Sequence, residues 1–185
     1  MERLGLRSDL DLALHLPLRY EDETRLTPLS QLRDGVSAQV EATVSDCRIE
    51  ARPRRQLVVR LREQGEELVL RFLHFYPSQQ KAMAPGTRVR ARGEVRIGFF
   101  GREMVHPAVK AVADGAPLPQ TLTPVYPAGA QLPQAYLRKA IASALQRAAL
   151  QEVLPPTLLP PGLPSLREAL QVLHHPPPQA SLAAL

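Results

Sequence analysis

Hydrophobic and polar residues alternate without interruption along residues 36–44, the period of a β-strand with one buried face. At Asp46 the alternation shifts by one position, so that Cys47 and Ile49 become the apolar positions. A shift of one residue inside a strong strand pattern indicates a β-bulge or a sharp bend. We therefore predict a long, bent first strand whose two halves pair with different neighbours, as the closure of a small barrel requires.

Four further strand patterns follow, and a short helical segment interrupts them. The strands are expected at residues 57–62, 68–75, 87–97 and 102–106. The helix is expected at residues 78–83, before Pro85-Gly86, and Gly98-Phe99-Phe100-Gly101 is expected to form the turn of the last hairpin. Three strands, a helix and a hairpin follow the order of an OB-fold. We predict a mainly β protein with a five-stranded OB-fold barrel and flanking helices.

Helices are expected on both sides of the barrel. Ser8 and Asp11 have the spacing of a capping box, which predicts a helix ending near Leu16 with Leu10, Ala13 and Leu14 on its apolar face. Residues 122–127 are expected to form an extended arm over the barrel. A long helix is expected at residues 132–153, with a buried stripe of Leu137, Ile141, Leu145 and Ala148.

A second C-terminal helix is expected at residues 165–174, because Ser165 and Glu168 form a full capping box. His174-His175 and three prolines should end it and begin a rigid linker. The predicted organisation is a helix and connector at residues 1–34, the barrel at residues 35–112, and an extension with the arm, both helices and the proline-rich linker at residues 113–185.

Composition narrows the class of protein. The 185 residues carry 23 Lys and Arg against 18 Asp and Glu, a net charge of +5 that is compatible with a polyanionic partner. The single cysteine, Cys47, cannot form an internal disulfide. We find no signal peptide and no apolar run long enough to span a bilayer, so we expect a cytoplasmic protein without membrane contact.

No residue pattern indicates catalysis. The five histidines have no recognisable catalytic or metal-binding arrangement. Gly93 and Gly98 have the spacing of a P-loop, but Phe99 occupies the position that requires lysine, and the segment lies on a predicted hairpin. We therefore expect no catalytic residue, metal site or cofactor in this segment.

Nucleic-acid binding is better supported. The first barrel loop carries Arg52, Arg54 and Arg55, whose guanidinium groups would attract phosphates. Aromatic residues that could stack on unpaired bases lie in two places, the end of the third strand and the hairpin turn: Phe72, Phe75, Tyr76, Phe99 and Phe100. The alternation of residues along the third strand predicts that Phe72 points inward and Phe75 outward. We expect the arginines and the rings to face one mouth of the barrel.

Each candidate has a structural alternative. Phe99 or Phe100 could fold back to fill the barrel end. The fourth strand carries a row of outward arginines that could be a basic stripe, a surface for an acidic partner, or plain solvated side chains: Arg88, Arg90, Arg92 and Arg96.

Several short motifs together resemble the bacterial RecG family of branched-DNA helicases. They are Leu14-His15-Leu16-Pro17-Leu18-Arg19-Tyr20-Glu21-Asp22, Gly93-Glu94-Val95, Met104-Val105-His106-Pro107, Leu122-Thr123-Pro124-Val125-Tyr126-Pro127 and Leu173-His174-His175-Pro176-Pro177-Pro178. The resemblance covers nearly the whole chain in the order of the family. It differs at His175, where the family usually has arginine.

The resemblance implies a wedge domain that grips the branch of a replication fork or Holliday junction during fork reversal, recombination and DNA repair. The motor domains of the parent helicase, with ATP and magnesium, would lie outside this segment, in a bacterial cytoplasm and near the nucleoid. It also implies that Phe72, Phe75 and Tyr76 stack on bases at the branch. An RNA-binding OB module and a protein-interaction module remain the alternatives.

Overall fold

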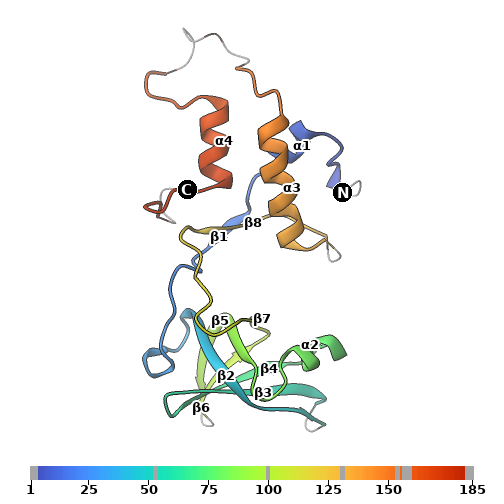
Figure 1. The fold of residues 1–185 in the computed structure, drawn as a ribbon, viewed down its shortest axis with the longest axis vertical. Helices are drawn as coiled ribbons and strands as arrows, with labels where there is room; N and C mark the ends of the chain where they lie inside the picture. Colours follow the sequence, from blue (N-terminus) through green and yellow to red (C-terminus); the bar gives the residue numbers. More distant parts are fainter. Residues whose placement is uncertain are drawn as a thin grey trace. The chain divides into compact units, whose positions relative to one another are not determined.

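The computed structural model describes residues 4–51, 54–98, 101–129, 132–152, 155 and 160–181. The chain divides into two compact units (Figure 1). One unit is the segment Arg25–Leu118, which we call the barrel unit. The other joins Met1–Thr24 to Pro119–Leu185, and we call it the helical unit. The candidate nucleic-acid-binding residues all belong to the barrel unit.

The barrel unit is a closed ring of five strands, as the sequence predicted. The strands are paired in the order β2-β3-β4-β6-β5, β5 pairs back with β2, and β7 extends the sheet beyond β5. The pairing of β4 with β6 is parallel, and the other pairings are antiparallel. The strands are β2 (Ser37–Glu50), β3 (Gln56–Glu63), β4 (Glu66–Phe72), β5 (Arg88–Gly98), β6 (Gly101–Val105) and β7 (Ala108–Ala111).

The bend predicted in the first strand is a β-bulge. Val44 pairs with Leu61 and Asp46 with Arg60, so the register shifts between these two pairs. The half of β2 before the bulge pairs with β5, and the half beyond it pairs with β3. Ile49, expected on the buried face, is instead 42% exposed. It lies beyond the last β2–β5 pair, where β3 is the strand paired with β2 in the described sheet.

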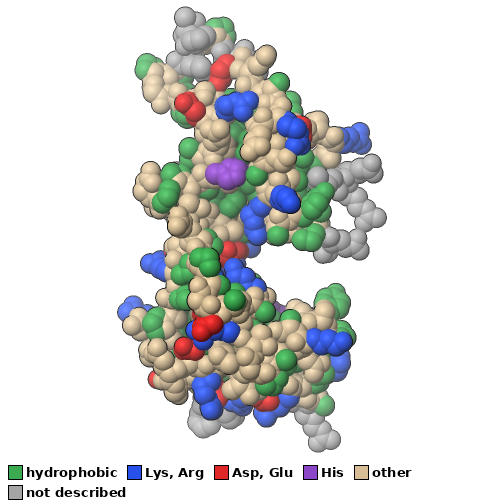
Figure 2. Space-filling model, viewed as in Figure 1, with side chains coloured by type: hydrophobic (Ala, Val, Ile, Leu, Met, Phe, Trp, Pro, Cys, Tyr) green, Lys and Arg blue, Asp and Glu red, His purple; other side chains and the backbone are tan. Residues whose placement is uncertain are grey.

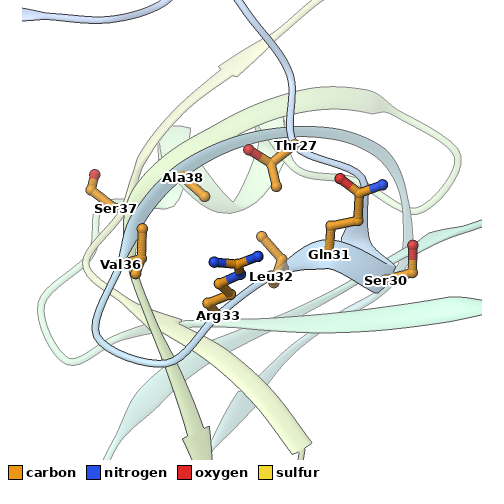
Figure 3. A pocket seen from close by; sticks show the side chains of 8 residues that line it. All are labelled: Thr27, Ser30, Gln31, Leu32, Arg33, Val36, Ser37 and Ala38. Carbon is orange, nitrogen blue, oxygen red and sulfur yellow. The ribbon is translucent and has the colours of Figure 1, made fainter.

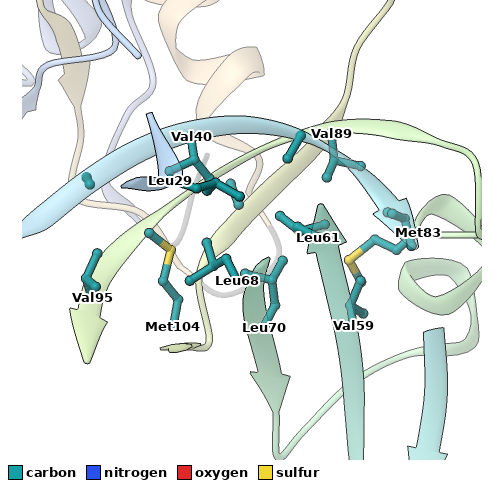
Figure 4. Packing of buried hydrophobic residues seen from close by; sticks show 14 of the residues in the cluster. Leu29, Val40, Val59, Leu61, Leu68, Leu70, Met83, Val89, Val95 and Met104 are labelled. Atoms are coloured by element: carbon teal, nitrogen blue, oxygen red, sulfur yellow. The ribbon is translucent and has the colours of Figure 1, made fainter. Parts of the chain in front are cut away.

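The interior of the ring is filled mainly by aliphatic side chains (Figure 4). Strands β3 and β4 contribute Leu61 and Leu70, and Met104 of β6 lies among them, all fully buried. Two short helices add side chains to this core: Leu29 belongs to η2 (Leu29–Gln31), and Met83 follows α2 (Pro77–Ala82), the predicted helix. A fully buried side chain of this size stabilises the fold by about 1.5–3 kcal/mol relative to an exposed one.

Among its described residues, the helical unit contains two short strands and three α-helices. They are α1 (Asp9–Ala13), β1 (Arg19–Glu21), β8 (Thr123–Val125), α3 (Gln134–Arg147) and α4 (Leu166–His174). The capping boxes predicted at Ser8 and Ser165 are both present. The predicted stripe of α3 is buried: Leu137, Ile141, Leu145 and Ala148.

The segment expected to be an extended arm is a strand, β8, which pairs with β1 in a two-stranded sheet of the helical unit. One expectation about this unit was wrong. Helix α1 ends at Ala13 rather than Leu16, and it buries Leu12 and Ala13 while Leu10 and Leu14 are about half exposed. A helix of five residues presents little more than one turn to a neighbour, so a stripe read over a longer helix does not apply.

His174, expected to help end the last helix, is a buried residue of this unit. Its side chain is 2% exposed. The Nδ1 atom lies 2.9 Å from the Tyr126 hydroxyl oxygen and Nε2 lies 2.8 Å from the carbonyl oxygen of Ala13. The imidazole therefore joins α4 to α1 and to the residue that follows β8. Burial lowers the pKa of His174, and the hydrogen bond to Ala13 opposes this shift only in part.

Candidate nucleic-acid interface

The loop between β2 and β3 lies beside the segment that follows β4. Leu57, near the beginning of β3, pairs with Phe72, the last residue of β4. The guanidinium carbon of Arg55 consequently lies 4.8 Å from the centre of the Phe75 ring. We call this end of the barrel, with Arg54, Arg55, Phe75 and Tyr76, the loop end.

Phe75 orients the cation at the loop end. Its ring packs against the hydrophobic core of the barrel and is half-buried. The Arg55 guanidinium lies over the ring, a cation–π contact of the kind worth about 0.5–1 kcal/mol at exposed sites. The expected outward orientation of Phe75 is thus only partial. The ring supports an arginine rather than standing free.

Tyr76 is the most exposed aromatic residue at the loop end, with 74% of its surface accessible. Its backbone is nevertheless fixed, because its N–H donates a hydrogen bond to the Gln79 Oε1 atom at 2.9 Å and Pro77 begins α2 immediately after it. A fixed backbone with an exposed ring loses little conformational entropy when the ring stacks on a base.

Phe72 is a core residue. It is 3% exposed and belongs to the barrel cluster, as its parity predicted. A buried ring cannot stack on DNA without leaving the core, so the structure separates Phe72 from the surface candidates. Its edge instead contacts the His106 ring, with centroids 6.1 Å apart and planes at 89°.

His106 holds the segment after β4 in place, a role that the sequence reasoning missed. Its Nε2 atom accepts a hydrogen bond from the Leu73 N–H at 3.2 Å, and its ring stacks on His74 at 6.0 Å. The backbone of His106 has a φ of 50°, a left-handed conformation uncommon outside glycine. Strain of this kind persists where surrounding contacts enforce it. The available signal was the motif Met104-Val105-His106-Pro107.

The remaining candidates of the two loops fall outside the described residues: Arg52, Phe99 and Phe100. The glycines that flank the hairpin turn, Gly98 and Gly101, are paired with each other. Strand β6 runs parallel to β4, with Val69 opposite Glu103, so it begins at the end of the barrel where β4 begins. This hairpin end is opposite the loop end. The expectation that both loops flank one mouth is therefore wrong.

The arginine row of β5 is not one basic stripe. Arg90 is 5% exposed, and its Nε atom lies 2.6 Å from Glu41, which also accepts a hydrogen bond from Arg88 Nε at 2.8 Å. Burial alone would raise the pKa of Glu41, but the two arginine hydrogen bonds outweigh it and the pKa is lowered. Arg92 is half-buried, and Arg96 is exposed with its Nε 3.6 Å from Glu94.

Lys and Arg side chains are spread over the visible face, with Asp and Glu among them (Figure 2). Several other barrel arginines are paired with carboxylates: Arg48, Arg60, Arg62, Arg71 and Arg102. Arg54 and Arg55 differ, because no carboxylate of the described residues lies within ion-pair distance of either. The loop end therefore carries two arginines whose charge no described carboxylate neutralises.

Other kinds of site find no support in the part of the chain that the structure describes. No cluster of three metal-ligating side chains occurs among these residues. Among the same residues, no helix combines the length and apolarity that a bilayer crossing needs.

Comparison with known proteins gives consistent results. The family model for the RecG wedge domain matches residues 1–147. The chain is 41% identical to the ATP-dependent DNA helicase RecG of Escherichia coli strain K12, over 100% of this chain and 27% of that protein. The identity to the protein of the same name from Pasteurella multocida is 39%, over 99% of this chain and 27% of that protein.

A solved structure described as RecG bound to a three-way DNA junction shares the fold. The TM-score is 0.68 over 94% of this chain and 24% of that one, at 19% sequence identity. The chain spans about a quarter of the length of the curated relatives that it matches.

Proposed function

This chain belongs to the RecG wedge-domain family, and on that premise we propose that its barrel unit binds branched DNA at replication forks and four-way junctions. It would serve a RecG-like helicase in fork reversal, recombination and repair, in the bacterial cytoplasm beside the nucleoid. ATP and magnesium would act in motor domains of the parent chain. The relatives are named ATP-dependent helicases, and one related structure is described as bound to a three-way junction.

One observation carries the proposal: the Arg55 guanidinium lies 4.8 Å from the Phe75 ring centre, next to the exposed Tyr76. A guanidinium can pair with a phosphate in two parallel hydrogen bonds. An exposed ring can stack on a base that has lost its partner. The loop end therefore offers a partner for each of the two groups that a junction presents: a guanidinium for the charged backbone and an exposed ring for unpaired bases.

The two kinds of contact have different consequences. Phosphate contacts by Arg54 and Arg55 would hold duplex and branched DNA alike, since every duplex has a backbone. Stacking on Tyr76 would favour branches, because bases inside an intact duplex are already stacked. Neither contact reads base edges, so we expect little sequence specificity.

The test measures binding of the 185-residue chain to forked and linear DNA at several salt concentrations. Replacement of Arg54 and Arg55 by alanine should weaken binding to both DNAs and lower the slope of log K against log salt by up to about 2, since each neutralised phosphate contributes about 0.9. Lys139→Ala removes a charge from the exposed face of α3 and is the control. Equal slopes for wild type and the double variant would remove these arginines from the site.

Two other outcomes would favour other functions. Structured RNA that displaces forked DNA at equal concentration would indicate an RNA-binding module. The absence of measurable affinity for forked DNA at low salt would contradict the proposal and favour a protein-interaction module.

A further inference from the structure

A second feature of the barrel unit lies at the hairpin end. A pocket of about 530 Å³ is present between η2 and the beginning of β2 (Figure 3). It is lined by Thr27, Ser30, Gln31, Leu32, Arg33, Val36, Ser37 and Ala38. The N–H of Gly35 donates to the Val95 carbonyl at 2.8 Å, which attaches this wall of the pocket to β5.

The pocket is positively charged and contains no acidic residue. Arg33 is the single charged residue in its lining, and Figure 3 shows its guanidinium between Val36 and Leu32. The adjacent carboxylate of Asp34 accepts a hydrogen bond from the Ile97 N–H at 2.8 Å. No carboxylate among the described residues lies within ion-pair distance of Arg33. The charge of this guanidinium is therefore available to a ligand.

Polar side chains surround this cation. Ser30, Ser37 and Gln31 are exposed, and in the described part of the chain their side chains make no hydrogen bond within the protein. Two hydroxyl groups and an amide beside a guanidinium are donors suited to phosphate oxygens.

Arg33 shares an unusual property with the loop end. Most described arginines of the barrel have a carboxylate partner, whereas Arg33, Arg54 and Arg55 have none among these residues. Strand β2 connects the two places, because it begins four residues after Arg33 and ends four residues before Arg54. A continuous strand fixes the separation between the two positive sites.

We propose that the Arg33 pocket is a second phosphate site, which binds a backbone phosphodiester of branched DNA at the hairpin end of the barrel. The inference rests on the proposed function and extends it. DNA held at the loop end raises the effective concentration of its other phosphates at the pocket, whereas free phosphate lacks this advantage. Two sites on opposite ends of one barrel would hold two arms of a branch.

The test compares Arg33→Ala with wild type, on forked DNA and on linear duplex, in the 185-residue chain. We expect the salt slope on forked DNA to fall by about 0.9, the value for one phosphate. Arg33→Lys should retain most of the slope because it keeps the charge. The matched control is Arg96→Ala, which removes an arginine that is 60% exposed but has Glu94 as a partner. It should leave the slope unchanged.

Interference by phosphate ethylation locates the contact. With wild type, ethylated phosphates in one arm should inhibit binding, and this inhibition should disappear with Arg33→Ala while the phosphates contacted by Arg54 and Arg55 remain sensitive. Thermal unfolding of Arg33→Ala should match wild type, since the Arg33 side chain makes no hydrogen bond or ion pair with the described residues and its backbone hydrogen bond with Val36 is unaffected by the substitution.

The outcomes separate this inference from the proposed function. Replacement of Arg54 and Arg55 could weaken fork binding while Arg33→Ala changes neither the salt slope nor the ethylation interference. In that case the assignment of a phosphate site to the Arg33 pocket is overturned and the proposed function stands. If wild type does not bind forked DNA, both are overturned. If inorganic phosphate binds wild type but not Arg33→Ala, and forked DNA does not compete for it, the ligand is free phosphate and the DNA assignment is overturned.

Discussion

Arg90 and Glu41 form a buried ion pair in the wall of the barrel, with Nε 2.6 Å from Oε2 and side chains only 5% and 7% exposed. The remaining donors of Arg90 bind the carbonyl oxygens of Ala116 and Pro117. The pair lies between β2 and β5, the two strands whose pairing closes the ring. It therefore stabilises the closure rather than contributing to the binding surface.

Removal of one partner should destabilise the barrel. Glu41→Gln leaves Arg90 buried without its counter-charge, a change that typically costs roughly 3–5 kcal/mol. Chemical unfolding measures the loss. Glu94→Gln is the control, because Glu94 is 59% exposed and pairs with Arg96 at the surface. A Glu41→Gln variant as stable as the control would show that the pair is dispensable.

In mild acid, protonation of His174 in the unfolded chain should lower the stability of the helical unit. Because its pKa is lowered in the folded chain, the unfolded chain binds more protons. The stabilisation is complete above the unfolded pKa of about 6.5 and is lost as the pH falls through the folded value. Helical circular dichroism during thermal unfolding, at pH 8 and at pH 5.5, measures the difference.

Two variants at neighbouring positions, His174→Gln and His175→Gln, test this pH dependence. His174→Gln should be less stable at pH 8 and should depend less on pH. His175→Gln should retain most of the wild-type dependence, because the charge of His175 is a smaller cause of the lowered His174 pKa than burial is. The same pH dependence in wild type and His174→Gln would contradict the assignment.

Replacement of Tyr76 should lower the preference for forks more than the affinity for duplex. Tyr76→Ala removes an exposed ring, and loss of one stacked base costs roughly 1–3 kcal/mol. Tyr76→Phe keeps the ring and should bind forks as wild type does. Fluorescence anisotropy with matched forked and linear DNAs provides the comparison. Equal losses on both DNAs would refute stacking at Tyr76.

Replacement of His106 should loosen the segment that carries Phe75 and Tyr76. His106→Ala removes the acceptor of the Leu73 N–H, a hydrogen bond worth about 1 kcal/mol. Hydrogen exchange at Leu73 should accelerate, and fork preference should fall. His74→Ala removes the stacked ring but leaves this bond, so its exchange should stay slow. Unchanged exchange in His106→Ala would contradict the positioning role.

Local patterns predicted much of the fold. The parity shift at Asp46 predicted the bulge, and the Ser8 and Ser165 spacings predicted two capping boxes, because each depends on residues a few positions apart. The buried stripe of α3 was predicted for the same reason. The environment of His174 was not, because Ala13 and Tyr126 are distant in sequence.

The features of the site that the sequence did not predict depend on strand register. Alternation correctly predicted that Arg90 points out of the barrel interior, but its neutralisation depends on Glu41 lying opposite it across the β2–β5 pair. The parallel pairing of β4 and β6 likewise separates the loop end from the hairpin end. Neither pairing leaves a local trace in composition or periodicity.

Ring closure also limits how copies of this chain can associate. Where a ring strand is bonded on both sides, it offers no backbone groups to another sheet, and β7, which extends the ring, is only four residues long and carries Lys110. Short edges that carry lysine discourage edge-to-edge aggregation. The doubly bonded parts of the ring and β7 should therefore disfavour pairing with the edge of another sheet, and self-association through them should proceed by side-chain contacts.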